Sequence, residues 1–493
     1  MSYKSSSDLY QLIKSMSRNE KRHFRQQADI YNREGEKAYM LVFNAFDKSE
    51  EFSEDKIIKS LSLPAYPVVK ARLTQLLLRF LTNLHLEKDS ENLLREQFLE
   101  AKILWSRGMS SHAIKHLERL RAKALLAEQY FIALEANQLL SKFLPPGRNR
   151  EFVVSFEKEI EKKKRLGEKL RGYALELEDC YFRNGVFRSS TVKDAMQHIF
   201  HDPEFRKFHC GTAGQHYWHA IAQGYSALLL GKPTKALELL VHEWDRFKEY
   251  PIPERSVFSE TMMTKLGLLF LRCAIVSSKF SLASETIKVL RTSKHDVNST
   301  LEFRALEMEY HLNSGNLDQA CCMEREAVEL IWKDESGTTN LLENNLAFQC
   351  LRTYFFSGRT KEFNALANRL VAGKDACKDI LFFKVYPLLI LSALDQGEAM
   401  LVRSYTATYS RKLSQCNCLN TPEITFLEMV RKLNGKTPFD RAATMKRYFT
   451  AFSLLCVDPV EAVIVQSMNV FKWMESIHNI AEEKQLSPVK IAV

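Results

Sequence analysis

Glycine and proline are scarce in this chain, which has 17 glycines and 13 prolines among 493 residues. Together they hold about half the share that they usually have in globular proteins. Because tight turns and hairpins consume these two residues, their scarcity argues against sandwiches, propellers, collagen-like segments and disordered linkers. It favours an all-α fold of long helices joined by short connections.

The motifs of several common enzyme classes are also missing from the sequence. It contains no GxxxxGK[ST] phosphate loop, no GxGxxG dinucleotide fingerprint, no GxSxG nucleophile elbow and no HExxH metal motif. The ten cysteines include no CxxC pair, and we interpret them as reduced thiols that mostly fill the core of a cytoplasmic protein. We therefore expect no catalytic residues and no cofactor, and we predict that the chain is not an enzyme.

Long hydrophobic runs are lacking as well. The best apolar run, residues 380–394, is interrupted by Lys384 and Pro387 and is shorter than the ~20 residues needed to span a bilayer. The Ser-rich start of the chain has no apolar core typical of a signal peptide. We expect no membrane insertion and a cytoplasmic location.

Apolar residues recur at steps of three and four along most of the chain, which is the spacing of one helix face. In the segment 65–86 these residues are Val69, Leu73, Leu76, Leu77, Phe80 and Leu84. The pattern predicts one long helix there.

Three further helices are expected upstream of that segment. Ser17 and Glu20 have the spacing of a capping box and predict a helix that runs to about Tyr31. A second helix is expected over 36–47, and a third begins after a cap at Ser53.

One local pattern recurs along the chain: a glycine that ends an apolar helix, a short polar turn, and a small or apolar residue five positions later. Its firmest members are Gly108 with Ala113, Gly231 with Ala236, Ser278 with Ala283, Gly315 with Ala320, Gly358 with Phe363 and Gly397 with Val402. Gly147, Gly185 and Gly435 extend the series to nine turns, about 41 residues apart.

Each member of the series predicts a helical hairpin. A glycine after the last helical residue adopts the left-handed conformation that other residues resist, and so ends the first helix. The residue five positions later faces the first helix, where a small side chain lets the two axes approach. A single hairpin cannot bury its apolar face, so neighbouring hairpins must stack.

The pattern resembles the repeat of tetratricopeptide-type α-solenoids. The resemblance is carried by ILWSRGMSSHAIKHL at 103–117, LLLGKPTKALELL at 228–240 and YHLNSGNLDQACC at 310–322. The first-helix signature of that repeat is mostly absent, although Gly224 stands where its small residue would be. The start of the chain, LIKSMSRNEKRHFR, also resembles an uncharacterised family of all-helical, repeat-bearing bacterial proteins, chiefly from the Bacteroidota, which implies no activity.

These observations predict an all-α protein: a right-handed α-solenoid of about nine helical hairpins behind a small N-terminal helical domain. We place the N-terminal domain at 1–90, the repeats at 91–455, and a capping helix with a tail at 456–493. The cap is expected as one apolar helix from Asp458 to about Ile480, which either packs on the last hairpin or forms an interface.

Histidines are concentrated in the middle of the chain. His198, His201, His209, Cys210, His216 and His219 fall within 22 residues. His198 and His201 are three residues apart, and so are His216 and His219. On a helix, this spacing would let both rings of a pair face one metal ion. The alternative, which we favour, is a His-rich helix end packed by aromatic residues, because no zinc-finger spacing is present. We expect no bound metal, with His198, His201, His216 and His219 as the candidates if one binds.

Basic residues form two groups that suit an anionic partner. In the first group, Arg18, Arg22 and Arg25 share one helix face. The second group lies in the segment 102–171, which has 16 Lys or Arg against 8 Asp or Glu. Its candidate partner-binding residues are Arg148, Arg150, Lys162, Lys163 and Arg165. Consecutive residues go around a helix, so an ordinary solvated helix is the alternative.

Two functions remain open from the sequence. The leading one is a non-enzymatic scaffold that binds a peptide or protein partner on the concave face of the repeats. The other is a nucleic-acid-binding regulatory protein that uses the basic groups. For that function, residues 53–84 would form a helix-turn-helix with Lys70, Arg72 and Arg79 on its second helix.

Overall fold

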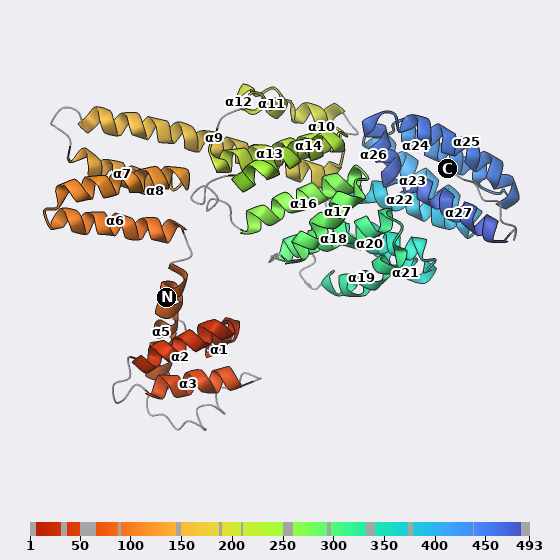
Figure 1. Ribbon diagram of the computed structural model, residues 1–493. Helices are drawn as coiled ribbons and strands as arrows, with labels where there is room; N and C mark the ends of the chain where they lie inside the picture. Colours follow the sequence, from red (N-terminus) through yellow and green to blue (C-terminus); the bar gives the residue numbers. More distant parts are fainter. Residues whose placement is uncertain are drawn as a thin grey trace. The chain divides into compact units, whose positions relative to one another are not determined.

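The chain is helical throughout the part that its computed structural model describes, and no strand occurs there (Figure 1). This confirms the predicted all-α class. None of the helices in that part is both long and apolar enough to cross a membrane. The structure describes residues 6–30, 37–49, 66–86, 90–143, 149–186, 190–208, 211–249, 260–292, 297–331, 341–372, 378–436 and 438–484.

Compactness divides the chain into two units, each of which is described by itself. The N-terminal unit comprises residues 1–125 and 129–153, and the C-terminal unit comprises residues 126–128 and 154–493. The division falls inside the predicted repeat region 91–455. The predicted boundaries at 90 and 455 mark where the repeat pattern begins and ends, which is a different property from compactness. They stay predictions.

The N-terminal unit begins with helices α1 (Ser6–Ser15), α2 (Arg18–Ile30), α3 (Lys37–Lys48) and α5 (Tyr66–Leu86). The capping box at the start of α2 is confirmed: the Ser17 N–H donates to Glu20 Oε2 at 2.7 Å, and the Glu20 N–H donates to Ser17 Oγ at 3.3 Å. The helix expected after Ser53, and with it the first half of the helix-turn-helix, lies outside the described residues.

The four helices share a small core in which aromatic rings meet. The buried members include Leu9, Ile13, Phe24, Val42, Phe43, Phe46, Leu73, Leu77 and Phe80. The Phe24 ring lies 4.9 Å from that of Phe43 and 5.3 Å from that of Phe80, centroid to centroid. Helices α6 (Ser90–Ser106), α7 (Ser110–Leu126) and α8 (Tyr130–Ser141) follow along the chain.

The long helix α9 leads into the C-terminal unit, which contains the remaining helices. Their bounds are α9 (Asn149–Asn184), α10 (Ser190–Ala195), α11 (Gln197–Phe200), α12 (Pro203–Arg206), α13 (Ala213–Leu229), α14 (Pro233–Glu249), α16 (Glu260–Val276), α17 (Phe280–Thr292), α18 (Val297–Asn313), α19 (Leu317–Leu330), α20 (Leu341–Phe356), α21 (Thr360–Ala372), α22 (Lys378–Asp395), α23 (Ala399–Gln415), α24 (Thr421–Leu433), α25 (Pro438–Leu455), α26 (Pro459–Ser467) and α27 (Val470–Lys484).

A left-handed residue is present at every described position where the pattern predicts a turn. Gly108, Gly185, Gly231, Gly315, Gly358, Gly397 and Gly435 all have positive φ, and so does Ser278, with a φ of 56°. In the α13–α14 turn, the Lys232 N–H donates to the Ala227 carbonyl at 2.8 Å, the bond of a Schellman cap. Gly147 lies outside the described residues.

The residue five positions after the turn is buried, as the pattern predicts. Ala113, Ala236, Ala283, Ala320, Phe363 and Val402 are all almost completely shielded from solvent. Three further turns use left-handed residues that the glycine pattern could not reveal: Glu128, Asn417 and Asn469.

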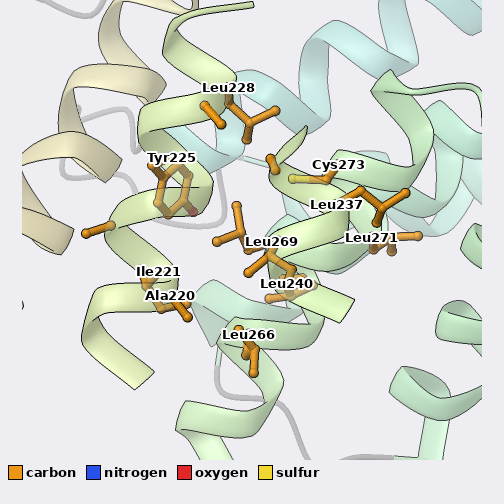
Figure 2. Close-up of a cluster of buried hydrophobic side chains, with 14 of the residues drawn as sticks. Ala220, Ile221, Tyr225, Leu228, Leu237, Leu240, Leu266, Leu269, Leu271 and Cys273 are labelled. Atoms are coloured by element: carbon orange, nitrogen blue, oxygen red, sulfur yellow. The ribbon is translucent and has the colours of Figure 1, made fainter. Parts of the chain in front are cut away.

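Helices of the C-terminal unit pack against their nearest and next-nearest neighbours along the chain. In particular, α16 contacts α13 and α18, and α20 contacts α18 and α22. Figure 2 shows side chains of α13, α14 and α16 meeting in one cluster, among them Tyr225, Leu240 and Leu269. Gly224 lets α13 pack closely against α16, because a Cβ there would come within 2.8 Å of Leu269 Cδ2.

The C-terminal segment differs from the single capping helix that we predicted. It forms two helices, α26 and α27, which are separated at Asn469, where φ is 58°. The pair packs on α24 and α25, as expected of a cap. Val460 of α26 also touches the α13–α14 turn, since a Cβ on Gly231 would lie 2.9 Å from its Cα. The pair therefore closes back onto the beginning of the stack.

The turn geometry makes a stability prediction. An alanine at Gly358 would meet no atom within 4 Å but must keep a φ of +70°, so Gly358→Ala should lower the free energy of unfolding by about 1 kcal/mol. Ser278→Gly should raise it by about 0.5 kcal/mol, because it relieves the same strain. Urea unfolding followed by circular dichroism measures both changes. Lys361→Ala, on exposed α21, is the control, and equal stability of all four proteins would contradict the prediction.

Candidate functional site

A cavity of about 560 Å³ lies within the C-terminal unit. Its walls come from the end of α9, from α16, α18, α20 and α22, and from the returning pair α26–α27. Four of these helices are the first helices of successive hairpins. The cavity thus lies on the side of the stack that the first helices line, and α26–α27 cover it.

One face of α20 forms the centre of the wall. Its lining residues are Leu341, Asn344, Asn345, Phe348, Gln349 and Arg352, which recur at the helical spacing of three and four. Such a face normally carries apolar residues when it is turned inward. Here four of the six side chains are polar or charged.

Carboxamide side chains dominate the polar lining. There are seven of them: Asn184, Asn313, Asn344, Asn345, Gln349, Gln466 and Asn469. Within the described part of the chain, Asn344, Asn345 and Gln466 make no side-chain hydrogen bond. A carboxamide both donates and accepts hydrogen bonds, as does a peptide group. The wall therefore presents free groups of both kinds to a ligand.

Arg352 lies at the base of this wall and is buried. Its Nε donates to Asn469 Oδ1 at 2.9 Å, its Nη1 to Gln349 Oε1 at 2.8 Å and its Nη2 to Asn313 Oδ1 at 2.8 Å. All three acceptors are neutral, so they orient the guanidinium without neutralising it. Burial lowers the pKa of Arg352, against the attraction of the more distant Glu309.

Lys472 of α27 approaches the same region. Its Nζ donates to the Leu312 carbonyl at the end of α18 and lies 4.8 Å from the centre of the Phe356 ring. Burial lowers the pKa of Lys472 to about 8, and the positive charge of Arg352 contributes to the same shift. Two coupled cations therefore belong to one wall of the cavity.

The predicted N-terminal basic residues do not act as one group. Arg18 and Arg22 are exposed on α2. Arg25 is half-exposed; its guanidinium pairs with the Asp47 carboxylate and lies 5.2 Å from the Phe43 ring centre. Arg25 is thus ion-paired, whereas Arg18 and Arg22 form no ion pair in the part of the chain that the structure describes.

The second basic group lies along α9. Arg150, Lys162 and Arg165 are exposed, and Lys163 pairs with Glu159 at 2.7 Å. Arg148 lies outside the described residues. These basic side chains are spread around α9, which fits the alternative of an ordinary solvated helix. None of the described basic candidates lines the cavity. Their role in partner binding stays a prediction.

The four histidine candidates pack against carbonyl groups, a carboxylate and aromatic rings, and the Phe208 ring lies against both His216 and His219. His198 contacts the Ala195 carbonyl at 3.0 Å and Glu176 Oε2 at 3.3 Å, and His201 contacts the Gln197 carbonyl at 2.9 Å. His216 is buried against the Phe208 ring, while His219 Nε2 lies 3.0 Å from the Phe205 carbonyl.

The metal interpretation gains no support from these contacts. Across the described ranges, no group of three or more His, Cys, Asp or Glu side chains is arranged to hold a metal ion. His209 and Cys210 fall in a gap between those ranges. Burial lowers the pKa of His219, as is typical of a histidine packed among aromatic rings.

Comparisons with known proteins leave the site to be interpreted from its own chemistry. No protein-family model, no curated protein and no solved structure matches the chain.

The sequence does carry one sign of the cavity. In the segment LLENNLAFQCLRTYFF, polar residues recur at helical spacing among apolar ones.

The buried ammonium group leads to a prediction about pH. The folded protein lowers the pKa of Lys472 from 10.5 to about 8, so between these pH values the unfolded chain binds more protons. Stability contributed by this group must therefore rise as the pH increases through that window. At pH 7, Lys472→Met should raise the free energy of unfolding by 1–3 kcal/mol, on the order of the charge penalty that it removes.

Urea unfolding at pH 7 and pH 10.5 measures this effect. The difference between Lys472→Met and the wild type should shrink toward zero at the higher pH, where Lys472 is neutral in the folded protein and half of it is neutral in the unfolded chain. Lys288→Met removes a charge from an exposed position on α17 and should stay within about 0.5 kcal/mol of the wild type at both pH values. A destabilised Lys472→Met protein at pH 7 would show that the ammonium is well compensated.

Proposed function

We propose that this chain is a non-enzymatic interaction protein that binds a peptide or protein segment in the cavity of its C-terminal unit. The observation that carries the proposal is the α20 face, where Asn344 and Asn345 point polar groups into the cavity without partners in the described structure. Both side chains are half-buried, and a ligand that covers them must satisfy their hydrogen bonds, because burying polar groups without partners is unfavourable. A bound polar chain would supply the missing bonds.

The architecture that we propose for this function is a right-handed, tetratricopeptide-like α-solenoid of about nine hairpins. It is supported by the left-handed turns and by the contacts of α16 and α20 with the next first helices. In such stacks the first helices line an extended binding surface. The cavity lies on that side of the stack, at α16, α18, α20 and α22.

An extended peptide suits the lining better than a wholly apolar ligand does. Each peptide group offers one N–H and one C=O, and a carboxamide can pair with both. Apolar side chains on the ligand would meet Phe348, Leu381 and Phe471, which also line the cavity. We further propose a cytoplasmic location, supported by the eight described cysteines, which are all free thiols.

Capture from a native lysate tests this function. The tagged full-length chain should retain a partner after mild crosslinking. Asn344→Ala/Asn345→Ala should reduce its recovery by about tenfold, since two to four hydrogen bonds of about 0.5 kcal/mol or more each are lost. Asn364→Ala, an exposed carboxamide on α21, is the matched control. A partner that is recovered equally with all three proteins, or no partner at all, would refute the proposal.

The alternative function, a nucleic-acid-binding regulator, is favoured by one observation. Arg18 and Arg22 are exposed on α2 and make no ion pair within the described part of the chain, as would suit contacts with phosphates. The pairing of Arg25 with Asp47 reduces this basic face. If the alternative holds, gel shifts at about 50 mM salt should show binding that weakens steeply as the salt rises. Arg18→Ala/Arg22→Ala should then weaken binding to all sequences alike.

A further inference from the structure

Arg352 and Lys472 differ from three other buried or half-buried cations of the C-terminal unit, each of which is paired with a carboxylate. Arg272 lies 2.6 Å from Glu302, Lys265 lies 2.5 Å from Glu178, and Arg359 lies 2.9 Å from Glu324. Arg352 and Lys472 form no such ion pair with any described carboxylate. Because an uncompensated buried charge is strongly unfavourable, this exception calls for an explanation.

The two cations keep hydrogen-bond donors that the protein does not use. A guanidinium has five N–H donors, and three of those of Arg352 go to Asn313, Gln349 and Asn469. An ammonium has three donors, and Lys472 directs one to the Leu312 carbonyl. The described structure leaves two donors on each group, and both residues line the cavity.

The charge of the lining is positive on balance. Arg272, Lys384, Arg352 and Lys472 face two carboxylates, Glu309 and Glu475. The charge of Arg272 is already balanced by Glu302 outside the lining. Lys384 lies 5.5 Å from the centre of the Phe348 ring. The lining therefore keeps three cations against two carboxylates, an excess of one positive charge that favours an anionic ligand over a cationic one.

We propose that Arg352 and Lys472 together form an oxyanion site, which binds a carboxylate or phosphate group of the ligand inside the cavity. This inference rests on the proposed binding function and names the group that such a ligand presents. The guanidinium offers a planar fork that suits two oxygens, and the ammonium offers a point charge beside it. The oxyanion takes the place of the missing protein carboxylate.

The site joins two segments that lie far apart in the sequence. Arg352 belongs to α20, while Lys472 and Asn469 belong to the returning pair α26–α27. A ligand that bridges them lowers the repulsion between the two cations and ties α27 to α18 and α20. Ligand binding therefore stabilises the closure of the C-terminal helices over the cavity.

Thermal unfolding of the full chain at pH 7 tests the site with two probes. Sulfate represents a tetrahedral oxyanion, and N-acetylglycine represents a peptide carboxylate; sodium chloride keeps the ionic strength constant, so that general screening does not contribute. At least one probe should raise the Tm progressively with concentration, as expected when a ligand binds only the folded state. The more effective probe distinguishes a phosphate-bearing from a carboxylate-bearing ligand.

Variants assign the effect to the two cations. Lys472→Met should weaken the apparent affinity for the better probe by about tenfold or more, whereas Lys472→Arg keeps the charge and should stay within about threefold. Lys288→Met should behave as the wild type. Since Lys472→Met is expected to be stably folded, loss of probe binding in that variant does not reflect unfolding.

The pH dependence provides a second readout. At pH 9.5 Lys472 is mostly neutral, because its pKa is about 8, so the affinity of the wild type should fall relative to pH 7. That of Lys472→Arg should not. The groups that face Lys472 are Arg352, Glu475 and the Leu312 carbonyl, and Glu309 faces Arg352. The carboxylates stay ionised over this pH range, and sulfate stays a dianion.

The outcomes separate this inference from the proposed function. The oxyanion site would be overturned if neither probe raised the Tm of the wild type. It would also be overturned if the probes had equal effects on the wild type and on Lys472→Met. A partner that still depends on Asn344 and Asn345 would leave the binding function standing in that case. Conversely, suppose that a probe raises the Tm in a Lys472-dependent manner while the lysate experiment captures no partner. That result would support the oxyanion site and refute the proposed scaffold function.

Discussion

The C-terminal unit depends on one backbone conformation, a positive φ at the residue between paired helices. Gly231, Ser278, Gly315, Gly358 and Gly397 each adopt it, and each reverses the chain so that the second helix packs on the first. The buried residue five positions later then sets how closely the two helices approach. The first helices α16, α18, α20 and α22 contact one another in chain order, and all four line the cavity.

The returning pair α26–α27 completes this cavity. Val460 meets the α13–α14 turn at Gly231, and Asn469 and Lys472 meet α20 and α18. The contact places Lys472 near Arg352, and among the described residues neither cation forms an ion pair with a carboxylate. A binding site commonly retains such unfavourable groups, because the ligand compensates them.

Much of the secondary structure was predictable because its signals are local. The capping box at Ser17 and Glu20, the helix over 65–86 and the glycine turns all follow from residues within a few positions of each other. The break at Asn469 was missed, since an asparagine in a left-handed turn resembles any other polar residue in the sequence. The candidate site was missed for a different reason: no local motif marks it.

The sequence by itself determined the helical class, the positions of the glycine turns and of the Ser278 turn, and the buried residue five positions after six of them. These depend on backbone sterics and on the periodicity of apolar residues, which act over one or two helical turns. Only the tertiary structure decided which polar residues share a cavity. Arg352 meets Asn313 and Asn469, which are 39 and 117 positions away along the chain. Such contacts follow from how the whole stack closes, because a buried charge takes the acceptors that packing brings to it.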